Sequence, residues 1–226
     1  MSDPAVHYRG AAGRHYHEVK RGVPEAALPW VARLRAARFQ PQVQPGDTVL
    51  EYGCGAGWNL AALKAARRIG FDVADFLRGE VERQGVEFVT DTAGLPAGLA
   101  DVVLCHHTLE HVLSPANALD EIRRLLKPGG RLLLGVPYEK ERRYRHFDPA
   151  EPNHHLFSWN VQTLANLVTD RGFAVTHAAL ARYGYDRFAA VWALRLRLGE
   201  PGFRLLRRLL IAMRPLWEVL LAARVR

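Results

Sequence analysis

A glycine-rich segment with the pattern Glu51-x-Gly53-x-Gly55-x-Gly57 follows an apolar run. Glycine tolerates positive φ angles and has no Cβ, so glycines at every second position let the backbone approach a ligand closely. The apolar run predicts a buried strand, and residues 58–67 after the loop predict a helix. A loop that joins a strand to a helix in this way indicates a site for a nucleotide-like group.

The spacing of these glycines disfavours a phosphate group as the ligand. In dinucleotide-binding folds the third glycine lies three residues after the second, whereas here the step is two and Glu51 precedes the loop. The segment instead resembles the first motif of class I S-adenosylmethionine (SAM)-dependent methyltransferases. SAM is a sulfonium cation with an amino acid tail and no phosphate, which an acidic strand end suits. A nicotinamide-dependent oxidoreductase is therefore disfavoured.

The following segments predict an alternation of strands and helices. Asp101–Cys105 is apolar on both faces, as a central parallel strand requires. The alternation indicates a doubly wound α/β sheet. The resemblance covers residues 49–175 and implies a Rossmann-like sheet of seven strands in the order 3-2-1-4-5-7-6, with an antiparallel last strand and helices on both faces. Further strands are expected at 68–72, 86–89, 131–136, 173–179 and 218–225, and helices at 76–84, 115–126 and within 185–214.

Acidic residues after the second and third predicted strands are candidates for SAM binding. Asp72 lies about 20 residues past the first motif, the distance at which one strand-helix-strand unit brings an acid beside a ribose. We expect it to bind the ribose diol, although a capping role stays open because Asp75 starts the next helical stretch. By the resemblance, Asp91, followed by Thr92, accepts a hydrogen bond from the adenine amino group. His106 completes the expected cofactor contacts.

The corner after the fourth predicted strand has three histidines and a glutamate within six residues. Methyl transfer is an in-line displacement at the sulfonium methyl, so the enzyme aligns the nucleophile and, for a hydroxyl, takes its proton. His107, Glu110 and His111 are spaced i, i+3 and i+4 and would share one face of a helix. One of these histidines can therefore act as a metal-free base.

The same corner is nearest in motif to ubiquinone-biosynthesis and small-RNA 2′-O-methyltransferases. These families use Glu-x-x-Glu-His and a later histidine to hold a divalent metal that polarises the acceptor hydroxyl. Here Glu110 and His111 match, His155 matches the later histidine, and His107 stands where the first glutamate would be. Such a set favours zinc, iron, nickel or manganese over magnesium. A metal on these four residues, a metal-free base and a purely structural cluster all stay open.

The length of 226 residues predicts one methyltransferase domain, residues 1–226, without repeats or low-complexity linkers. We expect residues 1–45 to form an N-terminal lid and helix and residues 46–182 the SAM-binding core. Residues 183–216 are expected to form a helical insertion and 217–226 the last strand. Within the first segment, a disordered leader is the alternative to a lid.

The two cysteines, Cys54 and Cys105, both lie in predicted site regions and offer no disulfide framework, which indicates a reducing cytosol. No apolar core of signal-peptide length is present at the N-terminus, and no stretch of about 18 uncharged apolar residues follows. The expected location is cytoplasmic, with peripheral association with the inner membrane as a further expectation.

The formal net charge of +8 is concentrated near the C-terminus. From Arg187 onward, nine arginines and two glutamates contribute +7. Residues 203–217 place apolar side chains along one helical face with arginines beside them. Such a helix can lie on an anionic membrane or dock a negatively charged substrate. The alternative is that its apolar face packs on the sheet.

The predicted function is SAM-dependent methyl transfer to oxygen, with nitrogen as the second alternative. The basic composition indicates an anionic acceptor, either a small molecule such as a sugar phosphate or a lipid-linked saccharide. Nucleic acid is disfavoured because no separate RNA-binding module is evident. The alternative from another class is a non-catalytic SAM-binding protein that associates with a membrane or a partner. The sequence predicts no oligomeric state.

Overall fold

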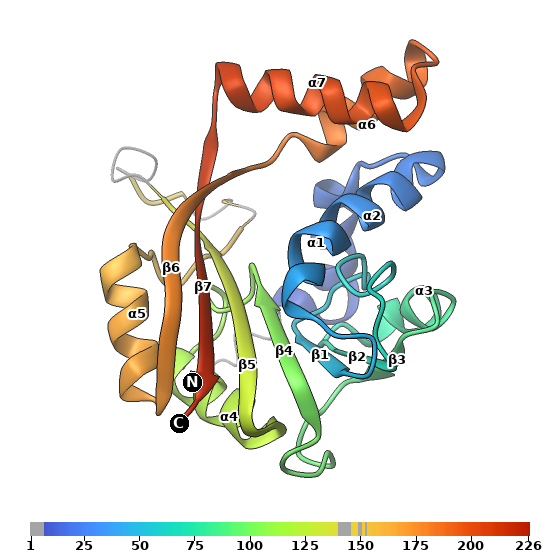
Figure 1. Cartoon of the computed structure of the whole chain (residues 1–226). Helices are drawn as coiled ribbons and strands as arrows, with labels where there is room; N and C mark the ends of the chain where they lie inside the picture. The colour runs from blue at the N-terminus through green and yellow to red at the C-terminus, as the bar shows by residue number, and fades with distance from the viewer. Residues whose placement is uncertain (1–6, 140–145, 149–150, 152) are drawn as a thin grey trace.

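The computed structural model describes residues 7–139, 146–148, 151 and 153–226 of the chain, and only the backbone at residues 12, 16 and 18–21. Its strands form one seven-stranded sheet of order β3-β2-β1-β4-β5-β7-β6 (Figure 1). The first five strands are parallel, and β7 runs antiparallel to both β5 and β6. The predicted fold class is confirmed. The strands are β1 Thr48–Tyr52, β2 Arg67–Phe71, β3 Glu87–Val89, β4 Ala100–His106, β5 Leu126–Pro137, β6 Phe173–Tyr183 and β7 Leu216–Val225.

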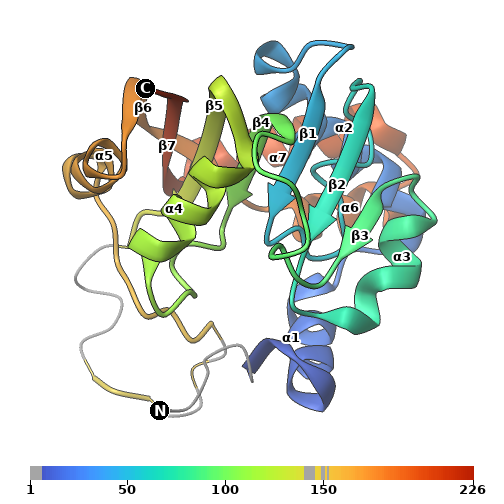
Figure 2. The same ribbon diagram turned by 90° about the horizontal axis from the view of Figure 1, so that it is seen from below.

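Helices cover both faces of the sheet. Figure 2 shows α4 and α5 on one side of the strands and α2 on the other. Each side has its own apolar core, one around α4 and α5 and one around α2 and α3. A smaller core joins α2 to α6 and α7. The helices are α1 Gly10–Arg21, α2 Leu28–Phe39, α3 Arg78–Glu82, α4 Pro115–Leu125, α5 Val161–Asp170, α6 Asp186–Arg195 and α7 Gly199–Met213.

Strand β4 supplies side chains to both main cores. Val103 and Cys105 pack on the side of α4 and α5, while Val102 and Leu104 pack on the opposite side. All four are fully buried, as expected for a central parallel strand. Because β4 is the middle strand of the seven, its end at His106 lies in the middle of the sheet's carboxyl edge.

The segment between β1 and β2 does not form the predicted helix over residues 58–67. Residues 58–62 make a turn with one helical hydrogen bond, from Ala61 N–H to the Gly57 carbonyl at 3.0 Å. The Arg68 guanidinium donates to the carbonyls of Leu60 and Ala61, at 3.3 and 2.7 Å. Because a continuing helix would use those carbonyls itself, the side chain from β2 replaces the next helical turn.

Other element boundaries differ by a few residues from the prediction. Residues 75–77 form a 3-10 turn ahead of α3, so the helix expected over 76–84 is shorter. Strand β5 begins at Leu126, where the preceding helix was expected to end. The helix expected at 203–217 stops at Met213, and Trp217 already lies in β7.

Helices α6 and α7 lie between β6 and β7 in the chain and extend beyond the body of the sheet (Figure 1). The two strands that hold them pair along their whole length, from Phe173 with Val225 to Tyr183 with Leu216. Ala189, Ala190 and Phe203 from these helices are fully buried against α2. The long hairpin therefore holds α6 and α7 beside the carboxyl end of the parallel strands.

Candidate active site

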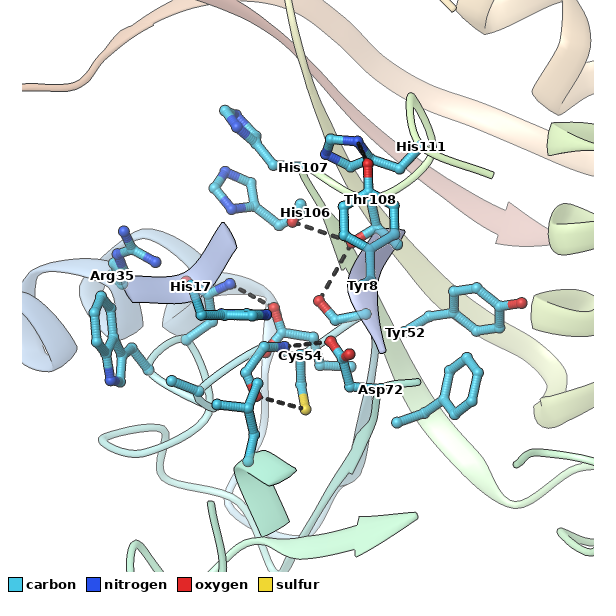
Figure 3. Close-up of a pocket in the computed structure, with 18 of the residues that line it drawn as sticks. Tyr8, His17, Arg35, Tyr52, Cys54, Asp72, His106, His107, Thr108 and His111 are labelled. Atoms are coloured by element: carbon cyan, nitrogen blue, oxygen red, sulfur yellow. Dashed lines mark hydrogen bonds between the residues drawn. The ribbon is translucent and has the colours of Figure 1, made fainter. Parts of the chain in front are cut away.

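A cavity of about 1020 Å³ opens at the carboxyl edge of the parallel strands. Its wall is formed by the loop after β1, the ends of β2 and β4, and parts of α1, α2, α6 and α7 (Figure 3). Ligands of open α/β sheets bind at this edge, where neighbouring connections leave the sheet in opposite directions. The position of the cavity agrees with the site expected from the glycine pattern.

The three glycines of the first motif have separate structural roles. All have positive φ angles, +81° at Gly53, +50° at Gly55 and +75° at Gly57. A Cβ at Gly53 would lie 2.3 Å from the Thr108 side chain, so this position is closed by the protein itself. A Cβ at Gly55 would meet only His17, at 3.6 Å, which leaves this backbone open to a ligand.

Gly53 and Gly55 line the cavity, whereas Gly57 does not, and its expected contact with a ligand stays a prediction. A Cβ there would approach Val81 of α3 at 3.3 Å. Its carbonyl accepts the N–H groups of Leu60 and Ala61. Gly57 therefore forms the turn and packs on α3.

Asp72 is held in a fixed orientation at the end of β2. Its Oδ2 accepts the Gly55 N–H at 2.7 Å, and its Oδ1 accepts the Ala74 N–H at 2.9 Å. Because each carboxylate oxygen can accept a second hydrogen bond, Asp72 keeps acceptor capacity toward the cavity that it lines. Asp75 makes no side-chain cap to the helical segment, so its alternative role has no contact to support it.

Glu51 is completely buried at the end of β1 and lines the cavity. The Asn59 amide donates to Oε1 at 2.5 Å, whereas no described residue bonds Oε2. Burial raises the pKa of Glu51 to about 8, against the opposing effects of the Asn59 hydrogen bond and of Arg35. A ligand ammonium beside Oε2 would provide the missing partner and favour the ionised carboxylate.

Asp91 and Thr92 lie outside the wall of the cavity. Asp91 is exposed, and its Oδ1 accepts the Ala93 N–H at 2.9 Å. Thr92 is buried, and its carbonyl accepts the Arg124 guanidinium at 2.9 Å. These contacts hold both residues in the loop after β3, and their expected contact with the adenine group stays a prediction.

His106 and His107 share one buried carboxylate, Glu218 of β7. The Nε2 atom of each imidazole lies 3.1 Å from Glu218 Oε2, and Arg38 of α2 donates to Oε1. If both Nε2 atoms donate, each Nδ1 is left as an acceptor. Glu218 itself is fully buried, while both histidines line the cavity.

The two histidines differ in their electrostatic surroundings. Burial and the neighbouring His107 lower the pKa of His106 to about 3, so its imidazole is neutral near pH 7. Burial would raise the pKa of Glu218, but hydrogen bonds from His106 and His107 outweigh it and hold that pKa well below its usual range. The carboxylate is therefore ionised.

The predicted four-residue set of His107, Glu110, His111 and His155 is divided in the structure. Residues 107–111 are not helical, because His107 has a φ of +54° and a turn follows it. His107 consequently points to Glu218. The other three residues form a second cluster, whose nearest ligand atoms lie within 4.8 Å of one another.

The second cluster is partly surrounded by hydrogen-bonding groups. Tyr8 lies 2.8 Å from His111 Nδ1, and Glu139 lies 2.8 Å from His155 Nδ1. The buried Glu110 carboxylate lies 3.7 Å from His111 Nε2. Two imidazoles with their outer nitrogens engaged, beside one carboxylate, are a donor set that fits a transition metal. Only His111 of this cluster lines the cavity.

Several residues of the site were not predicted from the sequence. Glu218 is the single acid in the strand segment Leu-Trp-Glu-Val-Leu-Leu, and an acid inside an apolar strand was an available signal. Arg38 had no local signal, because its partner lies 180 residues away in the chain. Tyr8 lies in the expected lid segment, but its contact with His111, 103 residues away, had no local signal.

The sheet order is that of the Rossmann-like methyltransferases, and the cavity lies beside the glycine motif. A family model described as a methyltransferase domain matches residues 19–178, which is more than half of the chain. The chain belongs to this methyltransferase-domain family. The family implies SAM as the methyl donor, and the unpartnered Glu51 oxygen, the anchored Asp72 and the open backbone at Gly55 fit that group.

Curated relatives share part of the chain. An uncharacterized 37.1 kDa protein in transposon TN4556 of Streptomyces fradiae is 34% identical over 157 residues, covering 58% of this chain and 45% of that protein. The ubiquinone biosynthesis O-methyltransferase of Acinetobacter baumannii is 33% identical over 106 residues, covering 40% and 44%. The probable tRNA methyltransferase 9B of Homo sapiens is 26% identical over 170 residues, covering 70% and 36%. The chain spans less than half the length of each.

Solved structures share the fold at lower identity. The complex between the Haloferax volcanii Trm112 methyltransferase activator and the putative methyltransferase matches all of this chain and 99% of that chain, with a TM-score of 0.61 and 19% identity. A possible histamine N-methyltransferase from Thermotoga maritima matches 74% of this chain and 80% of that one, with a TM-score of 0.58 and 23% identity. At these identities the two structures show that this chain shares their fold.

Proposed function

We propose that the protein transfers the methyl group of SAM to a hydroxyl oxygen, with His107 as the general base. The contact that supports this role is the 3.1 Å approach of His107 Nε2 to the buried Glu218 carboxylate. A hydrogen bond from Nε2–H directs Nδ1 to act as the proton acceptor, and the ionised Glu218 stabilises the imidazolium that forms. His106 has the same partner, but its low pKa makes it a weaker base.

Three residues are proposed to hold SAM in this arrangement. Glu51 would bind the ammonium of the amino acid tail, and Asp72 would accept hydrogen bonds from the ribose hydroxyls. The Gly55 backbone would pass beside the ligand. SAM supplies the methyl group on its sulfonium, and the protein's part is to align the acceptor oxygen and remove its proton.

The acceptor is proposed to be a small or lipid-linked molecule with an anionic group. Among the cavity's arginines, Arg207 is paired with Asp186 at 2.7 Å and Arg38 with Glu218. Arg187 also lines the cavity, and no ion pair joins it to another described residue. Its charge is available to an anionic group of the acceptor.

The N-terminal segment is proposed to act as a lid over the cofactor. The described part of this segment includes helix α1, and Tyr8 and His17 line the cavity. The His17 ring contacts Phe76 beyond β2, with centroids 5.6 Å apart, and Tyr8 bonds His111 beyond β4. The segment thus bridges two sides of the cavity. The expected lid residues 1–6 lie outside the described part of the chain.

The proposed acceptor contacts also include residues 138–159 and 183–214. Of the first segment, residues 140–145, 149–150 and 152 lie outside the described residues. A metal on Glu110, His111 and His155 is a second candidate for activating the acceptor, favoured by the approach of their ligand atoms. Nitrogen methylation and non-catalytic SAM binding remain the alternatives. The cytoplasmic location and the division into lid, core, insertion and last strand remain predictions.

Titration with S-adenosylhomocysteine followed by turnover with a panel of acceptors tests the proposed function. The panel pairs hydroxylated compounds with and without a phosphate or carboxylate group, and includes amines. We expect tight cofactor binding and methyl transfer to an anionic hydroxyl compound. His107→Gln should lower the rate by about 10² to 10⁴ while the affinity for S-adenosylhomocysteine stays unchanged. Transfer to amines alone, or an unaffected His107→Gln variant, would contradict the proposal.

A further inference from the structure

Helices α6 and α7 expose an unusual share of large apolar side chains. Among the described residues, eight of the twelve exposed large hydrophobic side chains lie between Phe188 and Leu216. Seven of these eight lie in the insertion between β6 and β7, and Leu216 is the first residue of β7. The exposed apolar surface is therefore concentrated on the part of the molecule that extends beyond the sheet (Figure 1).

Helix α7 is apolar on two opposite faces. Phe203 is fully buried in the small core with α2, and Leu206 and Leu210 pack against the same core. On the other face, Leu205 and Leu209 are spaced i and i+4 and are 58% and 51% exposed. A helix at a protein surface normally directs polar side chains toward water. The second face of α7 is instead apolar, and no other described element covers it.

Helix α6 repeats the arrangement. Small side chains, Ala189, Ala190 and Ala193, are fully buried against the neighbouring helices. Phe188 and Trp192, again at i and i+4, are 59% and 51% exposed. Both helices of the insertion thus bury one apolar stripe and present a second one outward.

Arginines without ion-pair partners accompany the outward stripes. The two acids of α6 and α7 are already engaged, Asp186 with Arg35 and Arg207, and Glu200 with Arg33 and Arg204. Other arginines of the insertion are exposed, and within the described part of the chain none of them forms an ion pair. These are Arg187, Arg195, Arg197, Arg208 and Arg214.

We propose that the outward face of α6 and α7 binds the surface of an anionic membrane, with both helices lying in the interface. Exposed leucine and aromatic side chains with arginines at their border are the composition of interfacial helices. Within the described residues, none of the helices has the length and apolar character that crossing a bilayer requires. A second copy of the chain fits less well, because it would bring these cationic faces together. The proposal is independent of the acceptor's identity.

Vesicle flotation tests this surface in the full chain. The vesicles are phosphatidylcholine alone or phosphatidylcholine with about 30% phosphatidylglycerol, at about 50 and 500 mM NaCl. We expect binding to the anionic vesicles at low salt, at least about tenfold weaker binding to neutral vesicles, and a marked decrease at high salt because exposed charges are screened.

Two variants separate the apolar and the cationic contributions. Trp192→Ser/Leu205→Ser/Leu209→Ser should reduce partitioning at least about tenfold, because the removed side chains would enter the interface. Arg208→Gln/Arg214→Gln should reduce it about tenfold to thirtyfold on anionic vesicles only.

The matched control for charge is Lys64→Gln/Arg83→Gln, which removes two exposed cations outside the insertion and should bind like the unmodified protein. Unchanged affinity for S-adenosylhomocysteine shows that each variant is folded and that the cofactor site is intact. No binding to anionic vesicles at low salt overturns the proposal. So does equal binding of the apolar variant, or a dimer in light scattering that this variant abolishes, because a second copy would then cover the face.

Discussion

The Nε2 atom of His107 lies 3.1 Å from Oε2 of Glu218, a carboxylate that is fully buried in β7. The pair joins the end of a central parallel strand to the antiparallel strand two positions away in the sheet. Glu218 aligns with Pro137 at the last residue of β5, so the sheet register brings the acid to the level of the cavity. A hydrogen bond to Glu218 through Nε2 orients the His107 imidazole, while Nδ1 remains available as a proton acceptor.

Glu218→Gln tests whether this carboxylate acts through its charge. The amide keeps the size of the side chain but cannot stabilise an imidazolium, so we expect the methyl-transfer rate to fall about 10² to 10⁴. The acid side of the pH–rate profile should shift as well, since the charge beside His107 is lost. Affinity for S-adenosylhomocysteine should change little. Glu87→Gln, at a half-exposed pair with Arg67, is the control. A normal methyl-transfer rate in the Glu218 variant would show that the contact between His107 and Glu218 has a structural role and does not support catalysis.

Asp72→Ala tests the proposed ribose contact. Loss of a carboxylate that accepts ligand hydrogen bonds should weaken S-adenosylhomocysteine binding by about 1 to 3 kcal/mol. Asp91→Ala is the comparison variant, because Asp91 is an exposed acid outside the cavity and its adenine contact stays a prediction. Calorimetric titration of both variants gives the comparison. Equal weakening in the two would instead indicate that the adenine contact expected from the family resemblance forms when the ligand binds.

Local patterns were sufficient to predict most of the strands and the glycine loop, because apolar runs and turn residues act over short distances. The strand order was predicted from the family resemblance, not from these patterns. Two predictions from the sequence were wrong because the local pattern did not determine the backbone. The helix over residues 58–67 is absent because the Arg68 side chain takes the carbonyls of Leu60 and Ala61. The four-residue histidine cluster was wrong because its spacing argument assumed a helix at the corner, where His107 has a positive φ.

The partner of His107 could not be found by spacing at all. Glu218 is 111 residues away in the chain, and only the pairing of β5 with β7 brings it near. A glutamate within an apolar strand indicates a buried acid, but it does not identify the imidazole that it meets. The predicted residues that do line the cavity, such as Glu51 and Asp72, follow directly after parallel strands and needed no long-range register.

The raised pKa of Glu51 predicts proton release when the cofactor binds. With a pKa near 8, much of the free protein has this carboxyl protonated at pH 7, whereas an ammonium beside Oε2 favours the ionised form. Calorimetry of S-adenosylhomocysteine binding in buffers of different ionisation enthalpy should therefore show protons released at pH 7. Glu51→Gln should remove the release and weaken binding. Identical heats across buffers in the unmodified protein would contradict the proposed ammonium contact.

The same group predicts a pH dependence of stability. The folded-state pKa of Glu51, about 8, lies above the ordinary value of 4.5 for a glutamate, so below pH 4.5 both states are protonated and the carboxyl does not change the stability. As pH rises toward 8 the unfolded state ionises first, and folding stability is lost over that window. Denaturant unfolding of the ligand-free protein should show this decrease, and Glu51→Gln should flatten it. If the stability of the Glu51→Gln variant falls with pH at the same slope, titratable groups other than Glu51 cause the decrease.

The second cluster gives the last prediction, which concerns metal. If Glu110, His111 and His155 bind a transition ion, purified protein should contain near-stoichiometric metal by elemental analysis. Occupancy should fall in acid, because imidazole ligands must be deprotonated to bind a metal. A chelator should remove activity but not S-adenosylhomocysteine binding, since the proposed cofactor residues lie on the loop after β1 and the end of β2.

Substitutions separate this metal from the base mechanism. His155→Gln should release the ion, whereas His177→Gln, at an exposed position of β6, should retain it and serve as the control. If a chelator has no effect while His107→Gln still lowers the rate, the base acts without a metal. The cluster of Glu110, His111 and His155 would then serve to anchor the N-terminal segment, because the Tyr8 hydroxyl lies 2.8 Å from His111 Nδ1. Tyr8→Phe should in that case increase proteolysis of α1, and S-adenosylhomocysteine should protect it less than it protects the unmodified protein.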